Sequence, residues 1–426
     1  MPFVPVQSKT MNLKKMMKSI TQKPDTLSRV YAFIALIVVL IEVGRLSYHE
    51  PIGEFLMSNS VFSIFCVIPV FVLIGSEHFK VNRVLMLFCV VATISLILNR
   101  PVVNYMSALR FCFFCGMLCL LSPLIDNAPL RQFRQYLWRF TLLMCQVLIV
   151  GTLVLYIVTC FWGEGELLLL VSHPMMLSLI AAIVAMLVTW RILSGNAENG
   201  RYRRILNYLF LIASLFILVW GGARSAIIGF VISEIYLLVV FRREWKKVAR
   251  VLITIVSFLM LIVVVGRDIT WRVECKFELG QEHNSVVFSR QQLWESRLEE
   301  FVESPVIGIG FANVTRYSTL YDNEEVAGVD QARTEEPGSS WLSVLSNTGI
   351  VGFLILAFWN YRLFVTIRHR CKSGDIVASQ YGALLILFIV SGVFEGWILY
   401  AGSFVFFIYW LLTARITTPG HYSVNL

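Results

Sequence analysis

The sequence has little charge for its length. Only 15% of its 426 residues are Asp, Glu, Lys or Arg, whereas 57% are hydrophobic and the mean hydropathy is +0.73. A soluble protein of this size carries charge on about a quarter of its residues. The shortage excludes a water-soluble fold and predicts a protein embedded in a lipid bilayer.

The cysteines form no disulfide or metal-binding pattern either. The chain has 9 of them, and most lie in apolar runs, where a thiol behaves as a small hydrophobic group. Cys112 and Cys115 have CxxC spacing, but no second pair or histidine ligand accompanies them. We therefore expect no disulfide framework, no metal and no cofactor.

What the sequence does contain is a series of long apolar runs. A hydrocarbon core of about 30 Å needs around 20 apolar residues in a helix, because lipid offers the backbone no hydrogen-bond partner. The sequence therefore predicts an all-α polytopic membrane protein with about 12 transmembrane helices. These are expected at residues 31–43, 60–74, 84–98, 108–124, 140–161, 168–189, 205–220, 225–241, 251–265, 350–365, 377–394 and 398–414.

The basic residues predict the orientation of these helices, because Lys and Arg concentrate in cytoplasmic loops. With the N-terminus inside, the loops assigned to the cytoplasm hold 25 of the 36 basic residues, from Lys9 to Arg415. A wrong number of helices would place basic clusters on alternating sides. The pattern thus favours an even number of helices with both termini cytoplasmic. It explains the net charge of +9 without nucleic-acid binding.

The predicted helices divide the chain into five parts. Residues 1–29 form a cytoplasmic N-terminal segment, and no apolar core precedes Tyr31, so this segment is no signal peptide. A short basic amphipathic helix on the inner leaflet and a solvated tail remain alternatives there. The other parts are transmembrane helices 1–9 at 30–266, a large external loop at 267–341, helices 10–12 at 342–414 and a cytoplasmic tail at 415–426.

The external loop is acidic, with 14 acidic and 7 basic residues, and we expect the chemistry of the protein there because long loops without a role are uncommon. Residues 289–305 predict a helix capped by Ser289, and its Arg290 and Arg297 flank an apolar face. The face comprises Leu293, Trp294, Leu298, Phe301 and Val302. A helix on the outer leaflet with snorkelling arginines and a substrate-binding helix are both open.

Several charged side chains lie in or beside apolar runs. Arg224 follows two glycines in WGGARSAIIGF, and an arginine near hydrocarbon usually faces a cavity or a partner. A snorkelling interfacial arginine is the alternative. Arg110 and Glu395 are weaker cases that could be helix-end charges, and Glu234 is a candidate for an ion pair inside the bundle. His173 precedes Pro174, where either a kink or a histidine facing a cavity is expected.

The end of the loop, TEEPGSSW at residues 334–341, places two carboxylates and two hydroxyls at a helix N-terminus. Free backbone N–H groups and the helix dipole suit an anion there, although an ordinary serine cap explains Ser339 and Ser340 equally well. Arginines that converge beneath such a loop suit phosphate. The external face is thus expected to bind a lipid-linked diphosphate.

These residues also carry a family likeness. The chain resembles the O-antigen ligase and Wzy-type polysaccharide polymerase superfamily of bacterial inner membranes. The resemblance lies in GGARSAIIGF, the loop helix with Arg290 and Trp294, the turn SPVIGIGF at 304–311 and SSWLSVLSNTGIVGF at 339–353. It covers residues 220–353, and the order of the motifs around one loop carries it.

The resemblance implies a GT-C-like glycosyltransferase of the bacterial inner membrane. Its active site would be periplasmic, in the large loop, and it would act on undecaprenyl-diphosphate-linked glycans without a nucleotide sugar or, in the ligases, a metal. By position, Arg224 and Arg290 look like the arginines that hold the donor diphosphate. The ligases carry a histidine just before the helix at 350–365, where this chain has Gly338, Ser339 and Ser340. This departure favours a polymerase of O-antigen, capsule or exopolysaccharide repeat units.

The resulting hypothesis is an inverting transfer of the growing glycan to the non-reducing end of another lipid-linked repeat. The assigned catalytic carboxylates are Glu336, Glu335 and Glu395. The diphosphate would be bound by Arg224, Arg290 and Arg110, and the glycan or acceptor by Trp294, Arg297, Ser339, Ser340 and His173. A chain-length regulator is a further candidate partner. The alternatives are an O-antigen ligase and a flippase, although flippases usually show repeated halves and this sequence shows none.

Overall fold

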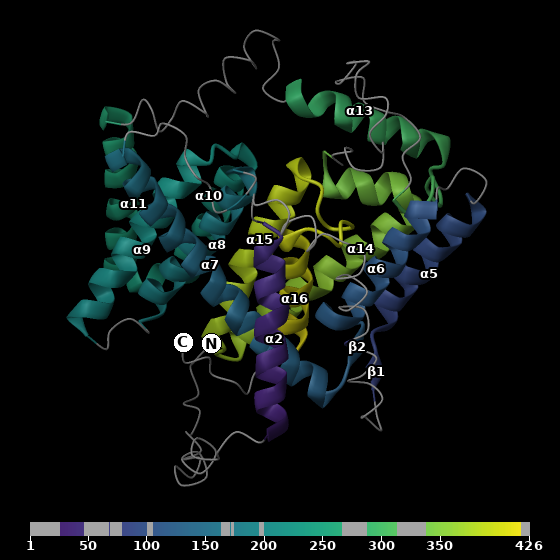
Figure 1. Cartoon of the computed structure of the whole chain (residues 1–426), viewed down its shortest axis with the longest axis horizontal. Helices are drawn as coiled ribbons and strands as arrows, with labels where there is room; N and C mark the ends of the chain where they lie inside the picture. Colours follow the sequence, from purple (N-terminus) through teal and green to yellow (C-terminus); the bar gives the residue numbers. More distant parts are fainter. Residues whose placement is uncertain are drawn as a thin grey trace, which may run out of the picture.

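The computed structural model describes residues 26–46, 68, 79–99, 105–162, 171, 174–195, 200–265, 288–312 and 338–418. Within these residues the chain is a helical bundle with one two-stranded sheet (Figure 1). Its elements are α2 (Thr26–Gly44), β1 (Lys80–Val81), α5 (Arg83–Leu98), α6 (Tyr105–Leu121), β2 (Ile125–Asp126), α7 (Ala128–Trp162), α8 (Pro174–Ser194), α9 (Arg201–Trp220), α10 (Arg224–Val240), the 3-10 turn η1 (Arg242–Glu244), α11 (Trp245–Val265), α13 (Phe288–Glu303), α14 (Ser340–Lys372), α15 (Ile376–Phe394) and α16 (Phe404–Thr417).

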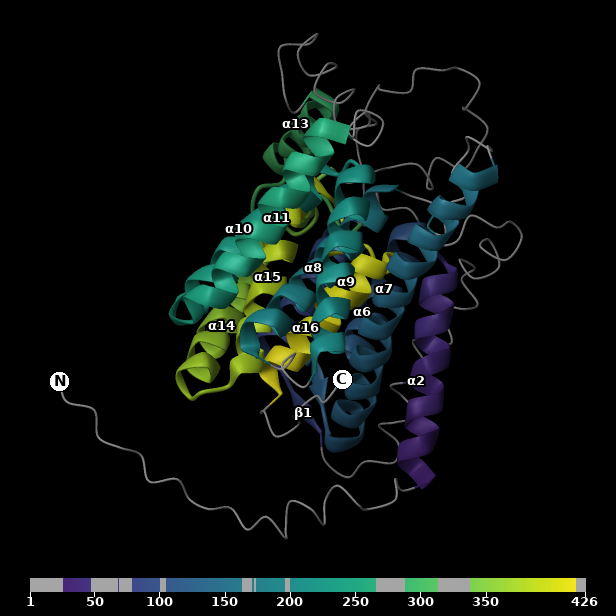
Figure 2. The same cartoon turned by 90° about the vertical axis from the view of Figure 1, so that its left-hand side faces the viewer.

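The helices run side by side in a bundle, as Figures 1 and 2 show from two directions. Six of the described helices are long and apolar enough to cross a membrane, or up to 7 if the bent pair at Arg224–Val240 and Arg242–Leu261 counts as one span. Three shorter apolar helices lie among them. The chain is therefore a multi-pass membrane protein. The count of 12 spans stays a prediction, and of the run at 60–74 only residue 68 lies within the described residues.

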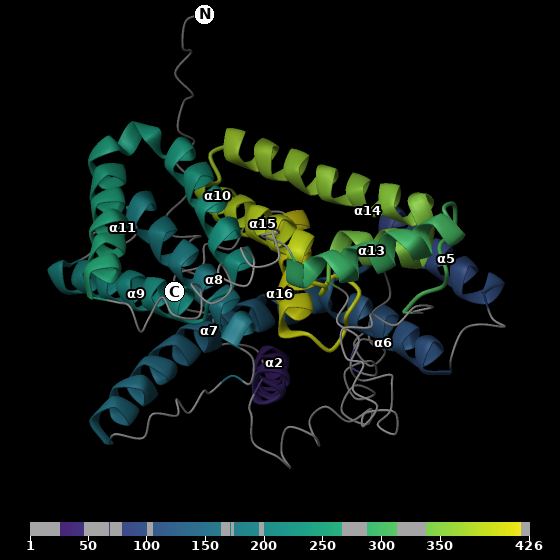
Figure 3. The same ribbon diagram turned by 90° about the horizontal axis from the view of Figure 1, so that it is seen from above.

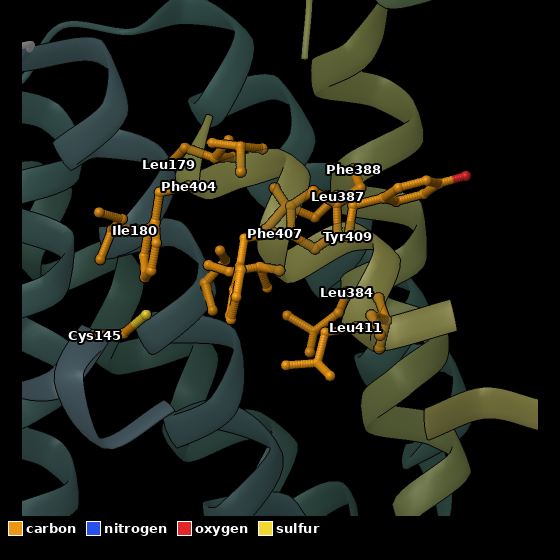
Figure 4. Close-up of a cluster of buried hydrophobic side chains, with 14 of the residues drawn as sticks. Cys145, Leu179, Ile180, Leu384, Leu387, Phe388, Phe404, Phe407, Tyr409 and Leu411 are labelled. Carbon is orange, nitrogen blue, oxygen red and sulfur yellow. The ribbon is translucent and has the colours of Figure 1, made fainter. Parts of the chain in front are cut away.

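The centre of the bundle is α16, which is buried on every side from Phe404 to Ile416. A helix that is hydrophobic all round is expected in such a position. Figure 4 shows Phe404 and Phe407 of this helix packed towards Cys145 of α7 and Ile180 of α8. On its other side Tyr409 lies near Phe388 and Leu387 of α15 (Figure 4). The late helices thus form the core around which the earlier ones are arranged.

Several helices start elsewhere than the sequence predicts: α2, α7, α11 and α14 begin earlier, at Thr26, Ala128, Trp245 and Ser340, whereas α8 and α16 begin later. The helix expected from residue 168 begins at Pro174, so Pro174 starts α8 and does not kink it. Proline suits the first helical position because it lacks the N–H that would have no partner there. The last helix begins at Phe404 and not at 398, because the Ser403 side chain caps it by accepting from the Val405 N–H at 3.2 Å.

The helix α14 is longer than predicted and is broken inside. It starts at Ser340 and has a non-helical residue at Gly349, with φ 63° and ψ −172°. The turn after α13 completes the hydrogen bonds at this break. Ile309 N–H donates to the Ser346 carbonyl at 2.9 Å, and Ile350 N–H donates to the Pro305 carbonyl at 2.9 Å. Within a membrane protein such a break is tolerated because neighbouring groups satisfy the freed backbone.

Close approach explains why the turn and the break both carry glycine. A Cβ on Gly349 would lie 2.3 Å from the Val306 backbone, and one on Gly308 would lie 2.4 Å from the Asn347 backbone. Asn99 of α5 then donates to the Gly308 carbonyl at 3.0 Å. The predicted tight turn at Gly308 is thus present, and it locks α13 onto α14.

The prediction of an ion pair for Glu234 is wrong within the described residues. The side chain is buried inside α10, beside Thr189 of α8, and neither carboxylate oxygen has a hydrogen-bond partner in that part of the chain. Among the described residues, Glu234 thus lies in the packing of α8 against α10 and forms no ion pair.

A candidate anion site with two arginines

One end of the bundle collects the polar residues that the sequence singled out. We call it the site end, formed by the first turns of α10 and α14, the helix α13 and the connection 395–403 between α15 and α16. Figure 1 shows α13 at this end, over α14, and Figure 3 shows the same end from above. The sheet, the α14–α15 connection and the last turn of α16 form the opposite end (Figure 2).

The centre of the site is the carboxylate of Glu395. Arg290 of α13 donates from Nη2 to Glu395 Oε1 at 2.9 Å. Ser225 of α10 donates from Oγ to the same oxygen at 3.2 Å. The exposed fractions of the Arg290 and Glu395 side chains are 12% and 23%. Three segments that are far apart in the sequence therefore meet at one partly accessible carboxylate.

Arg224 stands next to this group. It is the first residue of α10, directly after the turn at Gly221 and Gly222 that ends α9, and it is half-buried. Ser225, the next residue of α10, contacts the same Glu395 oxygen as Arg290, so Arg224 and Arg290 are neighbours at this carboxylate. Two arginines that repel each other favour the binding of an anion between them, because an anion removes the repulsion.

The two serines at the start of α14 have separate tasks. Ser339 is the N-cap, and its Oγ accepts from the Leu342 N–H at 3.4 Å. Ser340 Oγ donates to the Glu395 carbonyl at 2.7 Å and accepts from Trp397 N–H at 2.9 Å and Ile398 N–H at 3.2 Å. The Ser340 N–H also donates to the Glu395 carbonyl, at 3.0 Å. The cap interpretation of Ser339 is confirmed, and Ser340 fastens the connection that carries Glu395.

Trp294 joins α13 to the same point. Its indole Nε1 donates to the Gly338 carbonyl at 3.2 Å, and its ring lies 5.9 Å from the Phe394 ring, centroid to centroid. Trp294 is one turn from Arg290 on α13. The indole therefore holds the arginine's helix over the end of α15.

Comparison with known proteins agrees with this geometry. Residues 209–357 match the family model Wzy_C, described as O-antigen ligase. This segment, which is about a third of the chain, is similar to the O-antigen ligase family. No curated protein matches the chain. The matched segment begins inside α9 and ends inside α14, so it contains Arg224, Ser225, Arg290 and both serines, whereas Glu395 lies beyond it.

In the helix α13, the apolar face differs from the predicted one. Leu298 and Val302 are exposed at 45% and 74%, whereas Arg297 and Glu300 are buried. Arg297 Nη1 lies 2.9 Å from Glu300 Oε2. The helix also begins at Phe288, so Ser289 lies within it and is not its cap. Both arginines pair with carboxylates, which contradicts the snorkelling alternative, because a charge near apolar surroundings is stabilised more by a partner.

The other predicted site residues are not brought to Glu395 by a described contact. Arg110 lies half-buried on α6, at the flank of the site, where Phe111 packs on Phe311 with 5.1 Å between ring centroids. Ser107 of the same helix donates to the Ala312 carbonyl at 3.2 Å. His173, Glu335 and Glu336 lie outside the described residues.

Ser225 is the site residue that the sequence reasoning missed. Its signal was present, because it follows Arg224 in the first turn of a helix that begins near the membrane edge. Phe394 was also missed, and nothing in its apolar run distinguishes it before the fold is known. In the described part of the chain, no group of three or more His, Cys, Asp or Glu side chains could hold a metal ion.

Proposed function

We propose that the protein is a polysaccharide polymerase that transfers a growing glycan from undecaprenyl diphosphate to the non-reducing end of another lipid-linked repeat. The observation that carries this proposal is the pair Arg224 and Arg290, which the superfamily segment brings together beside hydroxyl groups at one end of a membrane bundle. Two fixed guanidinium groups match a diphosphate.

The surface below Arg224 supports a lipid-linked donor. Arg224 heads a row of exposed apolar side chains on α10 whose helical spacing places them on the same side of the helix. The row consists of Ile228, Val231, Ile235 and Val239. A polyprenyl chain can lie along this row while its diphosphate stays at the arginines. The tail would then remain in the membrane and the glycan outside it.

The reaction follows from that position. An acceptor hydroxyl attacks the anomeric carbon of the donor, the bond from this carbon to the diphosphate oxygen breaks, and configuration inverts. Undecaprenyl diphosphate leaves with the electron pair, and Arg224 and Arg290 stabilise the charge that develops on it. Electrostatic stabilisation of this kind is usually the largest contribution to catalysis. A carboxylate takes the proton of the acceptor, for which Glu335, Glu336 and Glu395 are the candidates.

The remaining residues receive supporting roles in the proposal. Trp294 and Arg297 would hold α13 above the donor, and Arg110 would add positive charge at its flank. Ser339 and Ser340 would position the acceptor through the start of α14, with His173 as a further glycan contact. The proposed setting is the periplasmic face of a bacterial inner membrane, with both termini cytoplasmic, no metal and a chain-length regulator as partner.

A polymerase is favoured over a ligase by the residues at the start of α14. The position at which the ligases carry histidine is taken here by Gly338, Ser339 and Ser340, which cap the helix and fasten the 395–398 connection. A flippase is the second alternative. It is disfavoured because the polar residues gather at one end of the bundle, whereas transporters usually bind near the midplane between two repeats.

The test of the function is Arg224→Ala in a strain that lacks the native gene. We expect loss of high-molecular-weight polymer with the same amount of protein in the membrane, because one half of the diphosphate clamp is gone. Loss of an equivalent donor typically costs about 10²–10³-fold in rate. Arg243→Ala serves as the matched control, because Arg243 is an exposed arginine in the turn η1, beyond the far end of the same helix α10.

The lipid-linked product in the deletion strain separates the alternatives. A single repeat unit on the outer leaflet indicates a polymerase, and a long polymer that is not transferred to lipid A core indicates a ligase. A unit trapped inside the cell indicates a flippase. Normal chain lengths in the Arg224→Ala variant would refute the assignment of Arg224 to the donor diphosphate.

A further inference from the structure

Glu395 has an unusual position for a residue of this site. It lies beyond the segment that matches the family model, in the first residue after α15, yet its carboxylate reaches Arg290 and Ser225 within that segment. In the structure, Arg290 holds this carboxylate at 2.9 Å. A donor diphosphate that binds Arg290 must therefore compete with Glu395.

The backbone of Glu395 is fixed, whereas its side chain is partly accessible. The Glu395 carbonyl accepts from the N–H and the Oγ of Ser340, at 3.0 and 2.7 Å, and its N–H donates to the Ser391 carbonyl at 3.0 Å. The side chain is 23% exposed. Rotation about its side-chain bonds can therefore release Arg290 without any change in the bundle.

Charge balance gives the direction of this exchange. Arg224 and Arg290 are both cations of the site, and Glu395 pairs with Arg290 at 2.9 Å. A diphosphate diester carries two negative charges, so it can offer a phosphate group to each arginine once the carboxylate has left Arg290. Because Glu395 Oε1 is held by one nitrogen of Arg290 and one hydroxyl, a group with several oxygens replaces it favourably.

We propose that Glu395 is an exchangeable anion: it holds Arg290 while the site is empty, yields Arg290 to the donor diphosphate, and then accepts the proton of the acceptor hydroxyl. This inference rests on the proposed function. The acceptor oxygen forms its bond to the anomeric carbon as the bond to the diphosphate breaks. The electron pair leaves with undecaprenyl diphosphate, and the proton passes to the carboxylate, which later returns it to water.

The exchange imposes an order on the reaction. While Arg290 holds Glu395, the carboxylate is a weak base, because its charge is already stabilised by a guanidinium group. Donor binding frees it, so the acceptor hydroxyl is activated only when a donor is in place. Glu395 thus couples recognition of the diphosphate to activation of the sugar hydroxyl. The coupling arises because the diphosphate and the carboxylate compete for Arg290.

The test compares binding and turnover in the full-length protein in lipid nanodiscs. The probe is undecaprenyl diphosphate without a glycan, and undecaprenol is the uncharged control. In the Glu395→Gln variant we expect binding of the probe to be at least about fivefold tighter, because the competing anion is gone. Polymer formation should fall by about 10²-fold or more, because the base is gone.

Two further variants make the result specific. Glu295→Gln removes the same charge from the exposed side of α13, where Glu295 contacts Gln291 at 2.9 Å, and should change neither quantity. Glu395→Asp keeps a base on a shorter side chain. It should bind the probe more tightly than the native protein and retain polymer formation that Glu395→Gln loses. A glutamine still accepts from Arg290 and Ser225, so the fold should persist, and the melting temperature in detergent checks this.

Each outcome separates the exchange from the proposed function. Unchanged or weaker probe binding in Glu395→Gln, together with lost binding in Arg290→Ala, would overturn the exchange and leave the diphosphate site intact. Unchanged binding in both Arg224→Ala and Arg290→Ala would overturn the proposed function itself. If Glu395→Gln does not fold, Glu395→Asp decides, because tighter binding with retained turnover is expected only of an exchangeable carboxylate.

Discussion

The two ends of the bundle hold their arginines in different ways. At the opposite end, Arg370 at the end of α14 donates to Asp375 Oδ2 at 2.7 and 2.9 Å. It also donates to the carbonyls of Arg415, Ile416 and Thr418, and its guanidinium group lies 5.5 Å from the Tyr381 ring centre. At the site end, Arg290 shares its carboxylate with Ser225 and lies near a second arginine.

This difference separates a structural arginine from a binding one. Arg370 gains the last carbonyls of α16 and a carboxylate, so its charge is compensated by the fold itself. Arg134 follows the same pattern at the α6–α7 connection, where it donates to the carbonyls of Cys119, Leu120 and Ile125 at 2.8, 2.8 and 2.9 Å. The site end instead brings two arginines together at one partly exposed carboxylate, an arrangement that the proposed donor diphosphate would complete.

The sharpest test of the comparison is Arg370→Ala. It leaves Asp375 without its cation and frees three carbonyls at the end of α16, so we expect a loss of about 3 kcal/mol in the free energy of unfolding. Denaturant titration of the full-length protein in mixed micelles measures it. The corresponding change at the site end, Arg290→Ala, should abolish polymer formation but lower the stability by less than about 1 kcal/mol. Equal losses of stability at the two positions would contradict the distinction.

Ser340→Ala tests how the site end is held together. The substitution removes the acceptor of two N–H groups, at Trp397 and Ile398, and one donor to the Glu395 carbonyl. We expect a loss of about 2 kcal/mol in stability, measured as the unfolding midpoint, and a matching fall in polymer formation because Glu395 is no longer fixed. Ser339→Ala removes the N-cap bond and one long hydrogen bond, 3.4 Å, to the Gly392 carbonyl, and should cost about 1 kcal/mol. A smaller loss of stability for Ser340→Ala than for Ser339→Ala would refute the role of Ser340 in holding the 395–398 connection.

Much of this fold follows from the sequence because apolar runs in lipid must be helical. The expected helices at 84–98, 205–220, 225–241 and 377–394 coincide closely with α5, α9, α10 and α15. The helix α14 was predicted too short because SNTG interrupts its apolar run, and only the turn at Pro305 and Ile309 explains how a helix continues through that break. Such a compensation between distant segments has no local signal.

The arginines of the site could be predicted from the sequence, but their contacts with other residues could not. Arg224 and Arg290 stood out because charge near hydrocarbon is costly, and that reasoning concerns single residues. The pairing of Arg290 with Glu395 joins positions 105 residues apart and depends on where α13 lies across the bundle. The burial of Arg297 and Glu300 in place of Leu298 and Val302 likewise depends on how α13 packs, which changes part of the face that periodicity predicts.

The smallest expected effect belongs to Ser225, whose hydroxyl is the second contact of the Glu395 carboxylate. Ser225→Ala removes a partly buried hydrogen bond of 3.2 Å and leaves the ion pair with Arg290 in place. Net values for such bonds are about 0.5–1.5 kcal/mol, so donor binding should tighten by roughly two- to tenfold if Ser225 helps Glu395 to resist exchange. Ser233→Ala, eight residues along the same helix and fully buried, provides the control for changes in α10 packing. If Ser225 instead contacts the diphosphate directly, its loss weakens binding of undecaprenyl diphosphate, so the sign of the change distinguishes a support of the carboxylate from a ligand of the substrate.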